Sequence, residues 1–263
     1  MSQDDELKTG WLEKKRSERG RRALERQLDY QQDKAAAFAD HEDNMVRMNF
    51  LRSQQVRQKL ESVRPFRESD KALEVGSGAH GLVFGLANSF GVGVDPLAVE
   101  YKRLFPKIQR TAPTVAAIGE ELPFGDAAFD IVLSDNVIDH AERPLAIIDE
   151  LVRVLKPGGV LYFTVNVHHP FYDLASRAHG AWNALGLKLE LSAFADHTIH
   201  LSEKRIADVF ANLPLNIIEQ TSTVGATKAA QRSASISNPD ALLKKMFFKN
   251  ALFEVVAKKL CCD

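Results

Sequence analysis

The stretch that most constrains this chain is a glycine-rich segment at residues 71–83, where an apolar run and an acidic residue precede three glycines. It reads Lys-Ala-Leu-Glu-Val-Gly-Ser-Gly-Ala-His-Gly-Leu-Val, so Gly76, Gly78 and Gly81 satisfy the spacing G-x-G-x-x-G. In that pattern a tight turn leaves a strand and lets backbone N–H groups approach a ligand closely. The glycines alone predict a nucleotide-like ligand, and Glu74 before them narrows the range of possible ligands.

Strand-like and helix-like segments alternate from residue 71 onward. The predicted strands cover residues 73–75, 92–94, 115–117, 129–133, 160–165, 215–218 and 251–257, and the predicted helices cover 82–87, 99–104, 145–155 and 202–213. Such alternation predicts an α/β fold in which helices cover both faces of a parallel sheet. Ligands of these sheets bind beyond the carboxyl ends of the strands, where Gly76, Asp95 and Asp135 are expected to converge.

Five motifs then occur in a recognisable order and spacing. They are Glu74-Val-Gly-Ser-Gly-Ala-His-Gly81, Val94-Asp95, Glu121-Leu-Pro-Phe124, Ala128-Phe-Asp-Ile-Val-Leu133 and Arg153-Val-Leu-Lys-Pro-Gly-Gly159. Together they resemble the class I S-adenosylmethionine-dependent methyltransferases, in particular the small-molecule branch with L-P-F, F-D and R-V-L-K-P-G-G. The resemblance covers residues 71–165 strongly. It implies a Rossmann-like, seven-stranded, mostly parallel sheet with an antiparallel last strand, and S-adenosyl-L-methionine as the cofactor.

The resemblance also implies a cofactor site. It places Glu74 near the methionine or ribose end and Asp95 on the ribose hydroxyls, where a carboxylate accepts two O–H bonds. A turn role before Pro96 is the alternative for Asp95. Much of the family has an Asp for the adenine amino group where this chain has Ile118, so the base is expected to meet apolar packing and a backbone N–H. The predicted cofactor-binding residues are Glu74, Gly76, Ser77, Gly78, Asp95, Pro96, Ile118, Gly119, Glu120, Asp135 and Asn136.

NAD binding is a competing interpretation, because the glycine spacing suits it and Asp95 lies near the expected acidic position. Glu74 and the three downstream motifs are not required by dinucleotide-binding folds. The methyl donor is therefore favoured.

Two pairs of histidines, His168 with His169 and His197 with His200, bear on the methyl acceptor. His140 follows the fourth predicted strand, and residues 166–200 interrupt the alternation and predict a cap over the strand ends. Asp196, His197 and His200 admit a metal site, a catalytic histidine or local hydrogen bonds. We assign no metal. The candidate catalytic residues are His140, His168, His169, His197 and His200.

The N-terminal part differs in character from the rest. Residues 1–65 mix charges at helical spacing, and Val46, Phe50, Leu51, Val56, Leu60 and Val63 form a partial apolar stripe that Pro65 ends. This predicts a helical extension that covers the cofactor pocket as a lid, beside a methyltransferase domain at residues 66–263. A second insertion is expected at residues 221–250, before the last strand.

Composition excludes several classes. The net charge of -1 gives no electrostatic reason to expect a nucleic-acid partner. No apolar run is long enough to span a membrane, so a cytoplasmic location is expected. The sequence thus predicts methyl transfer to a small-molecule acceptor, with a hydroxyl of a sugar, lipid-linked or natural-product-like compound favoured. The alternative is a cofactor-binding regulatory protein that recruits a partner through its N-terminal helices. Oligomeric state is left open.

Overall fold

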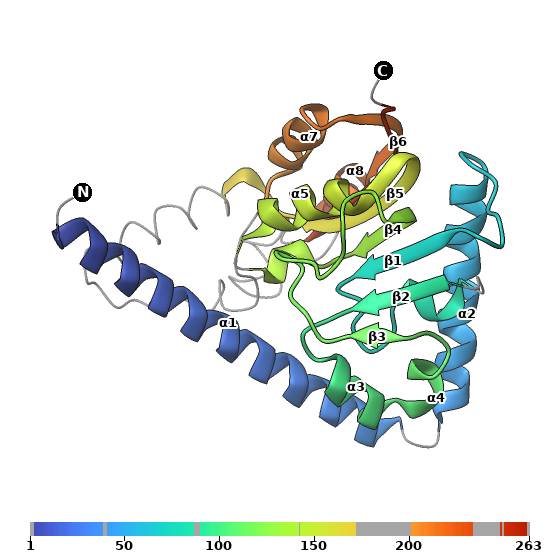
Figure 1. Ribbon diagram of the computed structural model, residues 1–263, viewed down its shortest axis with the longest axis horizontal. Coiled ribbons are helices and arrows are strands. Elements are labelled where there is room, and N and C mark those ends of the chain that lie inside the picture. Colours follow the sequence, from blue (N-terminus) through green and yellow to red (C-terminus); the bar gives the residue numbers. More distant parts are fainter. Residues whose placement is uncertain are drawn as a thin grey trace.

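The protein is built around a seven-stranded sheet in the order β3-β2-β1-β4-β5-β7-β6 (Figure 1). The computed structural model describes residues 3–38, 41–86, 90–141, 143–171, 201–233, 248 and 250–261. The strands are β1 (Lys71–Val75), β2 (Phe90–Val94), β3 (Thr114–Val115), β4 (Phe129–Asp135), β5 (Leu155–Val167), β6 (Leu215–Ser222) and β7 (Ala251–Lys259). The helices are α1 (Gln3–Ala37), α2 (Glu42–Glu61), α3 (Ala98–Leu104), α4 (Pro106–Gln109), α5 (Pro144–Val154), α7 (Glu203–Ala211) and α8 (Val224–Ser233). Two 3-10 turns are η2 (Leu82–Gly85) and η3 (Ile138–His140).

The strand directions confirm the predicted fold class. Strands β3, β2, β1, β4 and β5 pair in parallel, whereas β7 pairs antiparallel with both β5 and β6. From β1, the chain adds β2 and β3 on one side of the sheet and then returns to add β4 on the other side of β1. The carboxyl ends of β1, β2 and β4 therefore meet at the position where open α/β sheets bind ligands.

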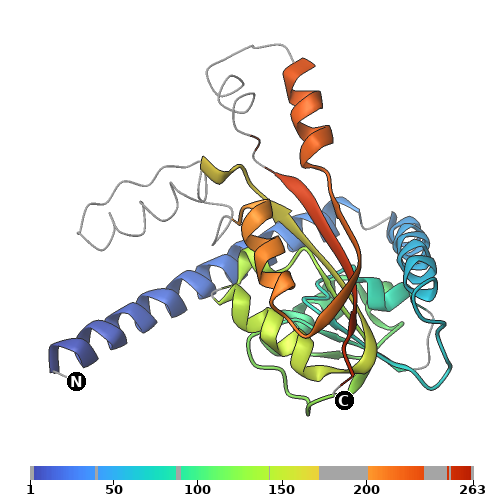
Figure 2. The same ribbon diagram turned by 90° about the horizontal axis from the view of Figure 1, so that it is seen from above.

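Two layers cover the sheet (Figure 2). Helices α5 and α7 lie on one face, where Ile148, Leu151 and Phe210 pack against strand residues such as Phe163 and Val255. Helix α2 and turn η2 lie on the opposite face, where a second apolar cluster forms. That cluster comprises Val56, Leu60, Ala72, Leu82, Leu86, Ile131, Leu133, Val160, Tyr162 and Val256.

The segment after β1 differs from its prediction. A helix was expected at residues 82–87, but η2 is a single 3-10 turn of four residues. Helix α2 packs closely on this turn, since a Cβ on Gly85 would lie 2.6 Å from Ser53 Oγ.

Side chains of α2 also supply hydrogen bonds that a longer helix would make internally. Asn49 Nδ2 donates to the carbonyls of His80 and Gly81, each at 2.8 Å. Gln54 and Arg57 donate to the carbonyls of Gly85 and Leu86 at 2.6 and 2.7 Å. Buried carbonyls need such partners, so α2 stabilises the connection between β1 and β2.

The buried face of α2 is only partly the predicted stripe. Its buried residues are Asn49, Ser53, Val56 and Leu60, whereas Phe50 and Leu51 are exposed. The prediction was wrong for the last two because it followed apolar residues alone. The later part of α1, including Leu24, Leu28 and Ala35, packs with α3 and α4 in a third cluster. Figure 1 shows the earlier part of α1 extending away from the sheet.

Most other predicted elements are present with shifted bounds, and β5 begins at Leu155, five residues before the predicted start. Strand β3 has two residues and not the expected three, and α5 ends at Val154, directly before β5. Ser202 occupies the N-cap position of α7, although its side chain makes no capping bond. Within the expected 221–250 insertion, α8 follows β6. Residues 234–247 lie outside the described residues, as do residues 172–200 of the expected cap.

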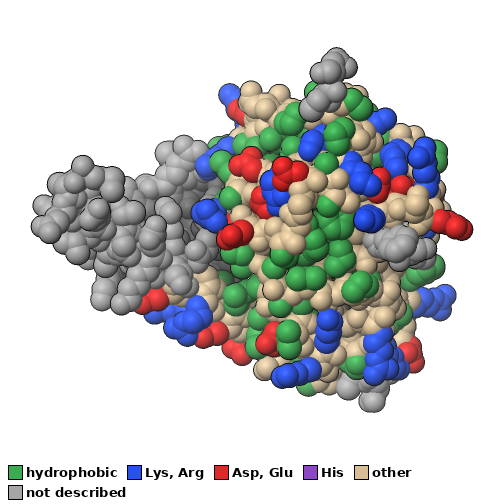
Figure 3. Space-filling model, viewed as in Figure 1, with side chains coloured by type: hydrophobic (Ala, Val, Ile, Leu, Met, Phe, Trp, Pro, Cys, Tyr) green, Lys and Arg blue, Asp and Glu red, His purple; other side chains and the backbone are tan. Residues whose placement is uncertain are grey.

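Charges of both signs are spread over the surface of the described residues. Figure 3 shows hydrophobic side chains down the middle of one face, with Lys, Arg, Asp and Glu around them. No helix among the described residues is long and apolar enough to cross a membrane.

Candidate cofactor and acceptor site

The glycine turn has the backbone that the fingerprint requires. Gly76 and Gly78 have φ angles of 74° and 54°, in the left-handed region that favours glycine. A Cβ on Gly76 would lie 2.3 Å from a methyl group of Val137, so glycine is also required sterically. At Gly78 a Cβ would meet only the Gly76 carbonyl, at 4.0 Å. This open side is where a ligand can approach the backbone.

Asp95 is bound to the same turn. Its Oδ2 accepts a hydrogen bond from Gly78 N at 3.0 Å and its Oδ1 accepts one from Leu97 N at 2.8 Å. Burial raises the pKa of Asp95 above its usual value, while the bonds from Leu97 and Gly78 oppose that shift. Asp95 therefore has the turn role that its position before Pro96 suggests, and each oxygen keeps a further lone pair for a ligand.

Glu74 faces the interior of the protein. It is 1% exposed, and its Oε2 accepts a hydrogen bond from Val83 N at 2.8 Å. A Cβ on Gly81 would lie 2.4 Å from that oxygen, which explains the third glycine. Burial, with a contribution from nearby Asp135, raises the pKa of Glu74 to about 8. The structure thus places Glu74 beneath the turn, where it holds the start of η2.

The other predicted cofactor residues surround this turn at the same edge of the sheet. Ser77 is buried, with its Oγ close to Gly93 on β2. Ile118 is 48% exposed, and Gly119 lies close to Val75 and Ile147. Glu120 Oε1 accepts a bond from Arg143 N at 3.3 Å. An exposed isoleucine beside a glycine offers an apolar surface and an accessible backbone to a flat base.

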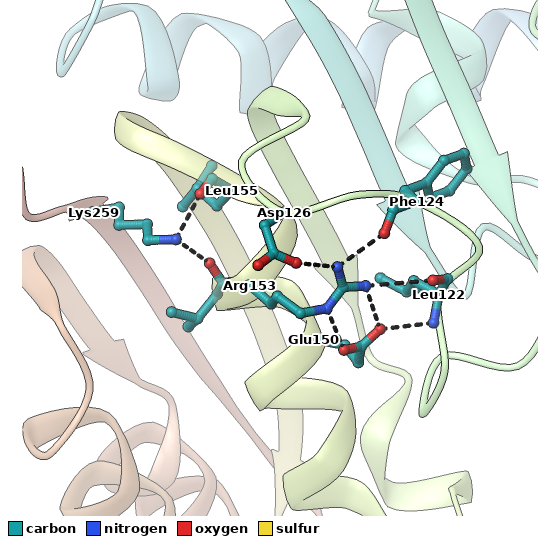
Figure 4. Close-up of polar contacts among 8 residues, drawn as sticks. Leu122, Phe124, Asp126, Glu150, Arg153, Leu155 and Lys259 are labelled. Atoms are coloured by element: carbon teal, nitrogen blue, oxygen red, sulfur yellow. Dashed lines mark hydrogen bonds and ion pairs between the residues drawn. The ribbon is translucent and has the colours of Figure 1, made fainter.

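The loop that carries Ile118 and Gly119 is tied to α5 (Figure 4). Arg153 donates to the carbonyls of Phe124 and Leu122 at 2.9 and 3.3 Å, and it pairs with Glu150 and Asp126. Glu150 in turn accepts from Leu122 N at 2.7 Å. Arg153 of the R-V-L-K-P-G-G motif thus anchors the loop that carries the L-P-F motif. These bonds are a physical reason why the two motifs occur together.

Asp135 and Asn136 lie at the carboxyl end of β4. Asp135 accepts from Thr164 Oγ1 at 2.7 Å and forms an ion pair with Arg52 of α2. Asn136 has a φ of 58°, which Asn tolerates, and its Oδ1 accepts from Asn166 N at 3.0 Å. Both residues line a cavity of about 460 Å³ between α2 and the sheet.

The histidine candidates are only partly described. The side chain of His168 is fully buried, and its backbone N–H donates to the Leu201 carbonyl at 2.8 Å. His169 Nδ1 accepts from Phe171 N at 3.2 Å, and burial, with Lys228 nearby, lowers its pKa. The side chain of His140 lies outside the described residues, as do Asp196, His197 and His200. Among the described residues, no three potential ligands are grouped as a metal site would require.

The sequence analysis missed several polar residues around the turn. Asn49 and Arg52 come from α2, and Gln109 Nε2 donates to the carbonyls of Gly78 and Ala79 at 3.1 and 3.0 Å. The helical spacing of Asn49, Ser53, Val56 and Leu60 could have identified the buried face of α2. It was overlooked because two of the four residues are polar.

Comparisons with known proteins agree with this geometry. Residues 73–163 match the model of a methyltransferase domain family. An uncharacterized methyltransferase of Mycobacterium leprae (strain TN) is 36% identical over 98 residues, which are 36% of this chain and 36% of the relative. The chain thus matches about a third of the length of such relatives.

Solved structures share the fold. A putative methyltransferase from Bacillus halodurans C-125 superposes with a TM-score of 0.55 at 15% identity, covering 78% of this chain and 99% of that one. Geranyl diphosphate C-methyltransferase from Streptomyces coelicolor A3(2), solved with Mg2+, geranyl diphosphate and S-adenosyl-L-homocysteine, has a TM-score of 0.52 at 15% identity. It covers 79% of each chain.

Residues 73–163 thus match a methyltransferase domain. The sheet order and the superposition show that the chain has the fold of the solved methyltransferases.

Proposed function

We propose that this protein binds S-adenosyl-L-methionine at the glycine turn and transfers its methyl group to a hydroxyl of a small molecule. The observation that carries the proposal is the convergence of the open backbone at Gly78 with the Asp95 carboxylate at the reversal point of the sheet. The methyl donor has a ribose diol, a flat base and a charged amino-acid tail. A carboxylate, an apolar loop and a close-approach backbone match those three parts.

The order of the site follows from the strands. Asp95 ends β2 and is expected to take the ribose hydroxyls, and Ile118 with Gly119 is expected to contact the adenine. The methionine part would then lie over Gly76 toward Asp135 and Asn136. Ser77, Pro96 and Glu120 complete the expected wall, and Glu74 acts from below by supporting the turn.

Methyl transfer places modest demands on the protein. The sulfonium is a good leaving group, so alignment of the acceptor atom with the methyl–sulfur bond and exclusion of water carry much of the rate. A hydroxyl acceptor additionally needs a group to take its proton. Asp135 and the histidine candidates are the titratable groups expected on that side of the site.

Calorimetry with S-adenosyl-L-homocysteine tests the cofactor assignment. Asp95→Asn, which keeps one accepting oxygen, is expected to weaken binding about tenfold to a hundredfold, the loss of one to two hydrogen bonds to a charged group. Asp149→Ala, on an exposed position of α5, is the matched control and should bind normally. Unchanged affinity in Asp95→Asn would contradict the ribose role.

Turnover separates the enzyme from a regulatory protein that only binds cofactor. Release of S-adenosyl-L-homocysteine is expected with hydroxylated acceptors. Single replacement of His168, His169, His197 or His200 would identify a catalytic histidine by slower release at unchanged cofactor affinity. Cofactor binding without release across broad acceptor classes would favour the regulatory alternative.

A further inference from the structure

The face of the sheet beneath α2 changes character along its strands. Leu133 on β4, Tyr162 on β5 and Val256 on β7 form one row of paired residues in the apolar cluster. Two residues closer to the carboxyl end of β4, the matching row is Asp135, Thr164 and Glu254. Because side chains two apart on a strand share a face, this polar row also lies beneath α2. Packing in an apolar core does not explain a row of polar side chains at this position.

Helix α2 matches this change. Arg52, Gln55 and Lys59 recur at helical spacing beside the apolar pair Val56 and Leu60. Together with Asp135 and Glu254 of the polar row and with Asn136 and Asn166, these three side chains line the cavity of about 460 Å³. That volume lies within the range of small-molecule sites, roughly 300–1,000 Å³.

The charges in the cavity wall are already paired. Arg52 contacts Asp135, and Lys59 contacts both Glu254 and Glu219, the latter at 2.9 Å. Tyr162 Oη donates to Glu254 Oε2 at 2.8 Å, and burial raises the pKa of Tyr162, so it stays a donor. A charged ligand would have to compete with these existing ion pairs for the same side chains.

Uncharged hydrogen-bonding groups complete the lining. Gln55, Asn136 and Asn166 each carry an amide with both donor and acceptor atoms, and Val56 and Leu252 are the aliphatic side chains of the lining. Hydroxyl groups both donate and accept, so several hydroxyls on one molecule match such a wall without a net charge. Aromatic or alkyl ligands would leave the amides without partners.

The cavity also adjoins the glycine turn. Asp135 lines it, and Val137, two residues further along, packs against Gly76 on the other side. An occupant that reaches Asp135 therefore lies next to the expected methionine end of the methyl donor. We propose that this cavity is the acceptor site and that its occupant is a neutral, polyhydroxylated small molecule. This inference rests on the proposed function and specifies the substrate class.

Binding of neutral polyols to the full chain tests the inference without a known substrate. We would use ligand-observed NMR with myo-inositol, methyl glucosides and glycerol, each with and without S-adenosyl-L-homocysteine. Glucose 6-phosphate, spermidine and catechol represent anionic, cationic and aromatic compounds. Selective binding of the neutral polyols, at millimolar affinity and stronger with S-adenosyl-L-homocysteine, is expected.

Two substitutions on α2 localise the binding. Gln55→Trp fills the cavity and is expected to weaken polyol binding at least tenfold, whereas Gln58→Trp, three residues along the same helix and outside the lining, is the matched control. Both variants should bind S-adenosyl-L-homocysteine as the wild type does. Tyr162→Phe, which removes the hydroxyl that donates to Glu254, is expected to weaken polyol binding by about threefold or more.

Each outcome has a defined meaning. Preferred binding of the charged or aromatic probes, no binding of any neutral polyol, or equal binding by the Gln55→Trp and Gln58→Trp variants would overturn the acceptor assignment. If the wild type does not bind S-adenosyl-L-homocysteine, the proposed function itself is contradicted. The calorimetric and NMR measurements thus separate the two failures.

Discussion

The two faces of the sheet are covered in different ways. On one face, α5 connects two parallel strands as a conventional crossover helix, and its buried residues Ile147, Ile148 and Leu151 follow helical spacing. On the other face, the described residues of the connection after β1 form the turn η2, and α2, from a part of the chain before the sheet, provides the cover. The first face contributes a scaffold. The second places charged and amide side chains beside the cofactor turn.

This difference indicates where variation is tolerated. Arg153 and Glu150 bind α5 to the L-P-F loop through backbone and carboxylate partners, which leaves little freedom. Arg52 on α2 is 54% exposed and makes one ion pair, with Asp135. Surface pairs of that kind contribute about 0–1 kcal/mol, so residues on α2 can change with the substrate while the fold persists.

The largest expected effect tests whether α2 is as integral to the core as α5. Leu60 on α2 and Leu151 on α5 are both fully buried. Leu60→Ala and Leu151→Ala are each expected to lower the free energy of unfolding by about 2–5 kcal/mol, measured by chemical denaturation. A loss below about 1 kcal/mol for Leu60→Ala alone would show that residues 1–65 are a separable extension. Leu51→Ala, at an exposed position of α2, is the control.

A smaller effect tests the ionisable groups on the α2 face. The folded pKa of Glu74, about 8, lies above its ordinary value of 4.5. Between these values the folded state holds a proton that the unfolded state releases, so stability falls as pH rises from 5 to 8 and then levels off. At about 1.4 kcal/mol per pH unit, the wild type is expected to lose roughly 3 kcal/mol over that window. Glu74→Gln, which keeps an accepting oxygen for Val83 N–H, should lose less.

The same denaturation series gives the outcome that would contradict this assignment. Equal pH dependence in the wild type and in Glu74→Gln would mean that Glu74 is ionised in the folded protein. Glu68→Gln, an exposed position before β1, controls for the removal of a carboxylate.

The smallest of the three effects concerns the face covered by α5, where Arg153 holds the L-P-F loop. Arg153→Met removes bonds to Glu150, Asp126 and two carbonyls but keeps the apolar stem. Because the guanidinium is partly exposed, a loss of about 1–2 kcal/mol in thermal or chemical unfolding is expected. Arg143→Met, at the other end of α5, should change little. Equal effects of the two substitutions would mean that the loop is held by packing alone.

Local patterns predicted much of the fold. Alternating strands and helices, a tight turn at Gly76 and Gly78, and the antiparallel last strand were all expected before the structure. The predicted cofactor residues meet at one edge because the carboxyl ends of parallel strands meet there. The bonds of Glu74 and Asp95 within the turn were not predicted, since hydrogen-bond partners depend on the exact course of the backbone.

The sequence by itself determined the sheet, its glycine turn and the match to a methyltransferase domain over residues 73–163, because these depend on residues close together in the chain and on the steric demands of glycine. Only the tertiary structure decided which side chains face the acceptor. Lys59 and Glu254 are 195 positions apart, and Arg52 and Asp135 are 83 apart. The packing of α2 against η2 brings these pairs together, and no local pattern of charge or hydrophobicity encodes a meeting over such distances.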